Sequence, residues 1–127
     1  MRGRSDSMWW GLVLEAPDPR ALAVFYTRLL DWPVVEYEPD HAIVKPPQEG
    51  VFVVFQHVPD FVPPEWPGTP DRQRMTMHID VEVGELEAAV EDAVALGATV
   101  AEHQPQENVR VLLDPVGHPF CLVVDQG

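Results

Sequence analysis

Apolar and polar positions along the chain follow an order that occurs twice. A β-prone run ending at Ala16 leads into an amphipathic helical segment, and the same succession begins again at His78. Shifting the first copy forward by 67 residues aligns Gly11 with His78 and Gly50 with Gly117. A repeat of this kind is typical of folds assembled from similar supersecondary units. It predicts two halves whose equivalent positions converge on one central site.

The first copy predicts one strand, one helix and three further strands. Asp18 is a suitable N-cap, and Pro19 suits the first helical position because its missing N–H would have no partner there in any case. Apolar residues then recur at helical spacing, and Pro33 disfavours helix in the residue before it. The expected elements are a strand at Met8–Ala16, a helix from Pro19 to Asp31-Trp32, and strands at Pro33–Glu38, His41–Lys45 and Val51–His57.

The second copy predicts the same five elements after a proline-rich connection. The segment Pro59–Pro70 carries five prolines, so we expect it to be extended rather than helical. Gly97 suits a left-handed helix end, and Asp114–Gly117 matches a type I turn. The expected elements are a helix at Glu85–Leu96 and strands at Met75–Val83, Ala98–Glu102, Val109–Leu113 and Pro119–Asp125. Each half thus predicts a βαβββ module, and the fold class is α+β.

Composition limits the classes of function. With 127 residues, 46% of them hydrophobic and 23% charged, the chain is long enough for one globular domain. No run approaches the roughly 20 apolar residues of a membrane helix, and the basic start lacks the apolar stretch of a signal peptide. The single cysteine, Cys121, fits a reducing compartment. We therefore expect a cytoplasmic protein that does not contact a membrane.

The charge of the chain is strongly acidic. A net charge of −13, from 21 acidic and 8 basic residues, argues against nucleic acid, whose phosphates need clustered lysine and arginine. Two interpretations remain: an acidic protein can attract cationic ligands, or the acidity is that of a solvated surface. We favour the solvated surface, because the charge of a whole chain bears on solubility before it bears on one site.

A likeness to known proteins is carried by four strings: Leu14–Tyr26 with Phe25-Tyr26 on the first helix, Met77–Asp80, Ala95–Ala98 and Asp114–Leu122. Together they resemble the vicinal oxygen chelate superfamily of glyoxalase, bleomycin-resistance and extradiol dioxygenase proteins, and above all its glyoxalase-like subgroup common in bacteria. The resemblance implies one domain over residues 1–127, built from βαβββ modules 8–58 and 75–125 and a Pro-rich linker 59–74. It also implies a cup-shaped mixed sheet with the helices on its outer face, and a homodimer.

The resemblance also implies where a metal would bind. In catalytic members, a His or Gln on the first strand of each module and a Glu on the last strand of each hold a divalent metal. The equivalent positions here are Gly11, Val54, His78 and Cys121, and only His78 matches. Because a catalytic zinc site normally has three protein ligands, we expect no resident cofactor. A divalent metal is disfavoured and, if bound, would use His78 with Cys121 or Gln56.

Without that metal, His78 and Asp80 are the candidate catalytic residues. Residues two apart on a strand share one face, so the Asp80 carboxylate can hold the imidazole by a hydrogen bond. The pair would then act as acid and base or anchor a ligand, unless His78 only helps to order the sheet. Cys121 lies in an apolar strand and is more often an inert side chain than a nucleophile. The other histidines, among them His41 and His103, are expected in turns or near strand ends.

Aromatic side chains near the strands predict a pocket for a flat or cationic organic molecule. Phe52, Val54 and Gln56 share one strand face, opposite Phe55 beneath the helix. Trp66, in the proline-rich segment, is free to fold over the mouth of the cup. The predicted ligand-binding residues are Trp9, Gly11, Phe52, Val54, Gln56, Trp66, His78 and Cys121. The alternative is that the tryptophans fill a dimer interface.

Three functions from different classes follow. The first, which we favour, is a glyoxalase-like or bleomycin-resistance-like protein that binds a small organic molecule in the cup without the usual metal. The second is a lyase or isomerase of the glyoxalase type, either metal-dependent or using His78 and Asp80. The third is an interaction domain whose cup is filled by its own side chains. The expected partners are a small molecule and a second copy of the chain, with neither nucleic acid nor a membrane.

Overall fold

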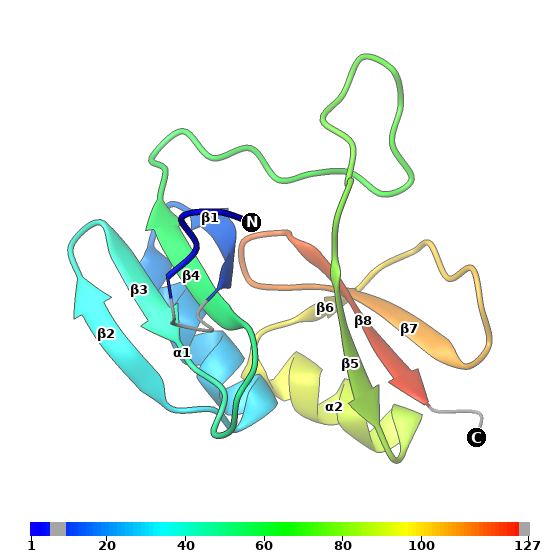
Figure 1. Ribbon diagram of the computed structural model, residues 1–127. Coiled ribbons are helices and arrows are strands. Elements are labelled where there is room, and N and C mark those ends of the chain that lie inside the picture. The colour runs from blue at the N-terminus through cyan, green and yellow to red at the C-terminus, as the bar shows by residue number, and fades with distance from the viewer. Residues whose placement is uncertain (6–9, 125–127) are drawn as a thin grey trace. The chain divides into compact units, whose positions relative to one another are not determined.

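A computed structural model describes residues 1–5 and 10–124. The chain divides into two compact units, Met1–Pro59 and Asp60–Gly127 (Figure 1). The first unit contains β1 (Gly11–Ala16), α1 (Pro19–Leu30), β2 (Val34–Glu38), β3 (His41–Val44) and β4 (Phe52–His57). The second contains β5 (Ile79–Val83), α2 (Leu86–Leu96), β6 (Thr99–Val100), β7 (Val109–Leu113) and β8 (Pro119–Val124). In the described part of the chain, no helix has the length and apolar content needed to cross a membrane.

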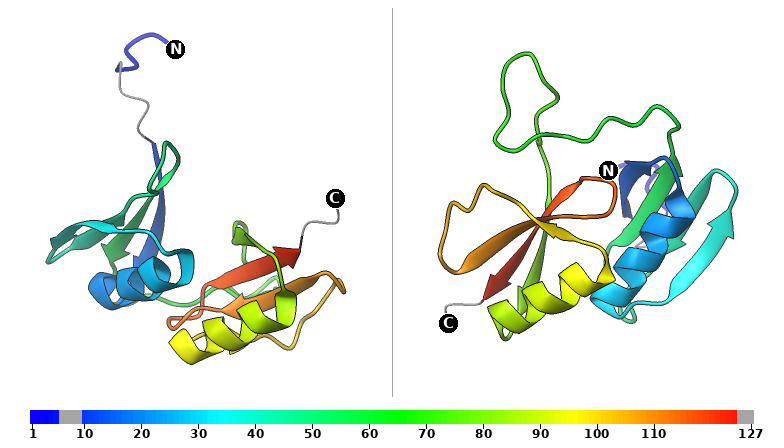
Figure 2. Two further views of the ribbon diagram at one scale, coloured as in Figure 1. Left: turned by 90° about the horizontal axis from the view of Figure 1, so that it is seen from below. Right: turned by 180° about the vertical axis from the view of Figure 1, so that it is seen from behind.

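Both units have the same strand order. The sheets run β1-β4-β3-β2 and β5-β8-β7-β6. β1 is parallel to β4 and β5 is parallel to β8, and the other pairs in these sheets are antiparallel. In each unit the helix covers one face of its own sheet (Figure 2). The predicted α+β fold of two tandem βαβββ modules is therefore confirmed.

Helix α1 begins and ends where the local sequence requires. Asp18 has an extended backbone, and its Oδ1 accepts a hydrogen bond from the Ala21 N–H at 3.2 Å. Pro19 follows at the first helical position. At the other end Asp31 is left-handed, with φ 56°, and its N–H donates to the Thr27 carbonyl. The predicted N-cap and helix are confirmed.

The core of the first unit lies between α1 and its sheet. The Tyr26 ring stacks on the Phe55 ring with centroids 5.5 Å apart, and both side chains are fully buried. Burial of side chains this large contributes roughly 1.5–3 kcal/mol each. Alternation along β4 turns Phe52 and Val54 to the opposite face of the sheet. The prediction that Phe55 packs beneath the helix is confirmed.

Strand β5 begins at Ile79, later than the predicted start at Met75. The Met75 N–H donates to the Glu65 carbonyl oxygen at 3.0 Å, so this segment pairs with the preceding loop and not with β8. Apolar character alone could not show this competition between two partners. His78 consequently lies just before the strand.

Strand β6 is also shorter than the predicted Ala98–Glu102. The Nε2 of Gln104 donates to the carbonyl oxygens of Ala101 and Val111 at 2.8 and 2.9 Å. The Oε1 of Gln104 accepts from the Val111 N–H at 3.0 Å. A side-chain amide thus takes backbone partners that a longer strand would use.

The predicted helix end and turn of the second unit are present. Gly97 ends α2 with φ 122°, a conformation that favours glycine. In the turn before β8, Gly117 has φ 101° and its N–H donates to the Asp114 carbonyl oxygen at 3.0 Å. This turn sets the start of the strand that carries Cys121.

Candidate functional site

The predicted pair His78 and Asp80 lies beside Cys121 on the second sheet. Asp80 is directly opposite Cys121 in the parallel pairing of β5 with β8. His78 Nε2 lies 3.1 Å from Asp80 Oδ1. Among the described residues, these three form the one group of His, Cys, Asp or Glu side chains whose ligand atoms all lie within 4.8 Å of one another. The sequence predicted the His–Asp pair and grouped Cys121 with His78, and the register of the strands places the cysteine directly opposite Asp80.

The three side chains differ in their access to solvent. The side chains of His78 and Asp80 are 30% and 61% exposed. Cys121 is buried in an apolar cluster with Val109 and Val111. Burial raises the pKa of the Cys121 thiol to about 11, and the charge of Asp80 and its hydrogen bond with the thiol add to the effect. The free cysteine is therefore a protonated thiol at neutral pH and a poor nucleophile.

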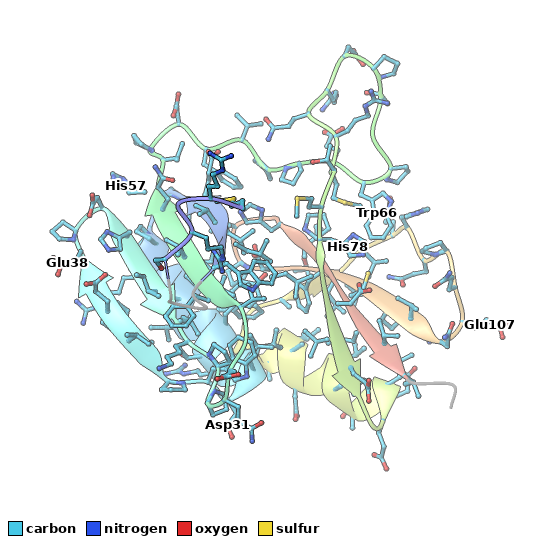
Figure 3. All side chains as sticks on the ribbon, viewed as in Figure 1. Asp31, Glu38, His57, Trp66, His78 and Glu107 are labelled. Atoms are coloured by element: carbon cyan, nitrogen blue, oxygen red, sulfur yellow. The ribbon has the colours of Figure 1, made fainter. Side chains whose placement is uncertain are left out.

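Trp66 lies against this group from the loop before β5. Its ring centroid is 5.0 Å from that of His78, with 31° between the ring planes (Figure 3). Trp66 also packs against the apolar cluster that contains Cys121. One large ring thus contacts both the polar and the apolar part of the site, as side chains in small-molecule sites commonly do.

The loop that carries Trp66 is held by bonds within itself. The Glu65 N–H donates to the Gln73 carbonyl oxygen at 2.8 Å, and the Met75 N–H donates to the Glu65 carbonyl oxygen at 3.0 Å. The Glu65 carboxylate also pairs with Arg72, at 2.8 Å between Oε1 and Nη1. Backbone and side-chain contacts therefore hold Glu65, the residue next to Trp66, in place. The proline content of the loop did not predict these contacts.

His103 is a further contact of Trp66 that the sequence did not single out. The two ring centroids lie 5.3 Å apart in an edge-on arrangement at 65°. The neighbouring Gln104 ties this segment to Val111 through its side-chain amide. The position of His103 depends on that long-range clamp, so no local sequence signal could have found it.

Most other predicted ligand-binding residues belong to the first unit. Gly11 opens β1, and Phe52, Val54 and Gln56 share the face of β4 that α1 leaves uncovered. Phe52 and Val54 are half-buried and Gln56 is exposed. Trp9 lies outside the described residues. The predicted set is thus distributed over both units, and the second unit holds Trp66 together with the donor side chains.

The two units differ at the positions that the resemblance assigns to a metal. Val13 pairs with Val54 in the first unit, as Asp80 pairs with Cys121 in the second. Neither of these valines nor Gly11 has a side-chain donor atom. The family's four-residue metal site therefore does not fit this chain, because the first module supplies none of its ligands.

The first unit also has a cleft of about 360 Å³ at the start of α1. Its lining residues are Asp18, Pro19, Arg20, Tyr37, Glu38 and Pro39. The Arg20 guanidinium already lies 4.5 Å from the centroid of the Tyr37 ring, and the Asp18 carboxylate caps the helix. Arg20 and Tyr37 thus already contact each other, and Asp18 already accepts a bond from the backbone. We therefore place the candidate site at His78 instead.

A second histidine–carboxylate group lies on the hairpin of β2 and β3. His41 Nε2 is 2.7 Å from Glu36 Oε2, and Nδ1 is 2.9 Å from Asp40 Oδ1. The hydrogen bonds with Glu36 and Asp40 raise the pKa of His41, and the hydrogen bond with His41 lowers the pKa of Asp40. Both ring nitrogens are engaged, so this group ties the hairpin together and leaves no nitrogen for a ligand.

Comparisons with known proteins agree with this fold. The sequence model of the glyoxalase-like domain family matches residues 11–123. No curated protein sequence matches the chain.

Several solved structures resemble the chain over most of its length. One is a glyoxalase/bleomycin resistance protein/dioxygenase family enzyme from Burkholderia phytofirmans, with 16% identity, TM-score 0.66, and coverage of 89% of this chain and 94% of the other. The fosfomycin resistance protein FosX from Listeria monocytogenes has 12% identity, TM-score 0.68 and 96% coverage of both chains. A lactoylglutathione lyase from Agrobacterium tumefaciens has 13% identity, TM-score 0.56 and 94% coverage of both. The chain belongs to the glyoxalase-like domain family.

Proposed function

We propose that this protein binds a small, flat organic cation on the face of the second sheet beside Trp66 and His78, without the metal site typical of the superfamily. The observation that carries the proposal is the position of Trp66, which packs on His78 and on the apolar cluster of Cys121. An indole face is the best aromatic partner for a cation. The exposed carboxylate of Asp80, next to that ring system, supplies the opposite charge.

The distribution of charge supports a cationic ligand. The second unit contains 13 acidic residues, 3 arginines and no lysine. Two of these arginines, Arg72 and Arg110, pair with Glu65 and Glu87. A surface of one sign raises the local concentration of ligands of the opposite sign. Much of the acidity that we assigned to a solvated surface is thus concentrated in the unit that carries Trp66.

Calorimetry with two flat probes of opposite charge tests the proposal. Protein kept in chelator would be titrated with proflavine, a planar cation, and with 9-anthracenecarboxylate, a planar anion. We expect the cation alone to bind, and Trp66→Ala to weaken its binding at least about tenfold, because a desolvated cation–π contact contributes about 2 kcal/mol. Trp32→Ala is the control, since Trp32 is a tryptophan of the first unit that belongs to neither the proposed site nor the proposed dimer contact. Equal affinity for both probes, no binding of proflavine, or unchanged binding by Trp66→Ala would refute the proposal.

The antibiotics named for similar structures extend this test. Bleomycin is a large cation with a flat ring system, whereas fosfomycin is a small phosphonate anion. The acidic second unit favours bleomycin and disfavours fosfomycin. Thermal shifts with each antibiotic measure this preference, and a larger stabilisation by fosfomycin would contradict it.

We also propose that the protein forms a homodimer. Trp10, just before the edge strand β1, and Val13 within it are 53% and 55% exposed, and exposed apolar edges favour association. Sedimentation velocity should give about twice the chain mass of 14.3 kDa. A single species at the monomer mass at high protein concentration would contradict this.

A second candidate function is a lyase or isomerase of the glyoxalase type. The contact of 3.1 Å between His78 Nε2 and Asp80 Oδ1 favours it, because a carboxylate that orients an imidazole leaves Nδ1 to accept and return a proton. The assay follows thioester formation from methylglyoxal and glutathione. Activity should fall about a hundredfold or more in His78→Gln. Equal rates for His78→Gln and the wild type would exclude this role.

A further inference from the structure

Internal duplication provides a comparison within the chain. At three equivalent positions the first module has Gly11, Val13 and Val54, whereas the second has His78, Asp80 and Cys121. The strands that carry these positions are paired in the same way in both units. The sheet therefore does not require donor side chains there, since valine and glycine build the same architecture in the first module.

The donor atoms lie at distances that suit one ion. The imidazole nitrogen, the carboxylate oxygen and the sulfur of this group all lie within 4.8 Å of one another. Zinc bonds to nitrogen, oxygen and sulfur are about 2.0–2.3 Å long, and at tetrahedral angles two ligands of one ion lie about 3.3–3.8 Å apart. The side chains of His78 and Asp80 reach solvent, so they can move inward by the roughly 1 Å that tetrahedral binding requires, and they give an ion access from water.

We propose that His78, Asp80 and Cys121 bind a thiophilic divalent cation such as Zn²⁺ entirely within the second unit. This proposal goes beyond the organic ligand proposed above and does not depend on it. Binding replaces the S–H bond of Cys121 with a sulfur–metal bond, and the proton passes to solvent. No electron transfer is involved.

The composition of the group selects the class of metal. A thiolate is a soft ligand that favours zinc, cobalt or cadmium over magnesium, calcium or manganese, which prefer oxygen. The superfamily's arrangement of nitrogen and oxygen ligands from both modules cannot form here, because the first module has none. The apolar shell of Trp66, Val109 and Val111 around Cys121 would limit water near the sulfur.

Cobalt titration of the full chain gives a direct readout without any assay of activity. Metal-free protein without organic ligand would be titrated with Co²⁺ and followed by absorption. We expect one Co²⁺ per chain and a near-ultraviolet sulfur-to-cobalt charge-transfer band, both abolished by one equivalent of Zn²⁺. The chain has a single cysteine, so such a band identifies Cys121 without a variant. Co²⁺ that binds without this band, or no Co²⁺ bound, would overturn the proposal.

Matched variants locate the other ligands. Asp80→Asn removes an exposed carboxylate, so the protein should fold, and we expect its Co²⁺ affinity to fall at least about tenfold. His41→Gln is the control, because it disrupts the other His–carboxylate group of the described residues. Loss of binding in His41→Gln with full binding in Asp80→Asn would place the ion elsewhere and refute the proposal. Calorimetric titration of metal-free protein with proflavine remains a separate measurement, so either proposal can fail alone.

Discussion

Replacement of Asp114 with alanine should destabilise the turn that leads into β8. Asp114 is buried, with 4% of its surface exposed. Its Oδ1 accepts hydrogen bonds from three consecutive backbone N–H groups, those of Val116, Gly117 and His118, each at 3.0 Å. Alanine has no side-chain oxygen, so these three N–H groups lose their hydrogen bonds to residue 114 Oδ1.

The magnitude follows from these contacts. Each hydrogen bond of this kind contributes about 1 kcal/mol net, because the donors are only partly buried and share one oxygen, so Asp114→Ala should cost about 3 kcal/mol. For a chain of this size that corresponds to a fall in Tm of about 10 °C. Asp114→Asn keeps an acceptor oxygen but not its charge, and should cost about 1 kcal/mol.

Two measurements on both variants test this reasoning. Urea unfolding gives the change in the free energy of unfolding, and amide exchange of residues 116–118 reports on the turn alone. We expect faster exchange of these amides in Asp114→Ala than in Asp114→Asn. If alanine and asparagine were equally destabilising, or if exchange at 116–118 were unchanged, the carboxylate would not organise the turn as inferred.

Three further predictions concern other groups. Because Glu36 and Asp40 raise the pKa of His41 above its usual value near 6.5, their stabilisation is present below that value and is lost as pH rises through the higher folded pKa. The Tm of the wild type should therefore exceed that of His41→Gln by less and less between about pH 6 and about pH 9. A difference in Tm that grows over this range would contradict the inferred direction of the pKa shift. Cys121, with its pKa raised to about 11 by burial, should react with iodoacetamide at pH 7 far more slowly in the native protein than in urea, unlike an open thiol. Gln104→Ala removes three hydrogen bonds and should lower the free energy of unfolding in urea by about 2–3 kcal/mol, with faster exchange at the Val111 amide. A change near zero would mean that water replaces these hydrogen bonds.

Local chemistry made part of this fold predictable. The N-cap Asp18, the helix end at Gly97 and the turn before β8 depend on residues close in sequence, and all three are found. The internal repeat also placed β8 correctly, since the offset of 67 residues carries Phe52–His57 onto 119–124. Where a single residue type and its neighbours decide the backbone, the sequence was sufficient.

Competition between distant partners was not predictable. Met75 has the apolar character of a strand, but its N–H pairs with Glu65 of the loop. Gln104 shortens β6 by bonding to Val111, and this brings the adjacent His103 to Trp66. These arrangements depend on which of several backbone or side-chain partners wins, and a pattern of hydrophobicity contains no information on that choice.

The candidate site shows the same division. A spacing of two residues was enough to predict the contact of His78 with Asp80, although His78 lies just before β5 and not within it. The third member, Cys121, joins them only through the register of β5 against β8. The internal repeat had placed Cys121 at one of the four metal positions, together with His78, but it did not place it next to Asp80.

The central claim is that the functional surface is the part of the second sheet beside Trp66 and His78. Proton–nitrogen correlation spectra of the labelled protein, recorded during a proflavine titration, test it most directly. We predict that the largest shifts fall on the Trp66 indole and on the amides of His78, Asp80 and Cys121. Shifts centred on Arg20 and the other residues of the first-unit cleft, or no shifts at all, would contradict the account.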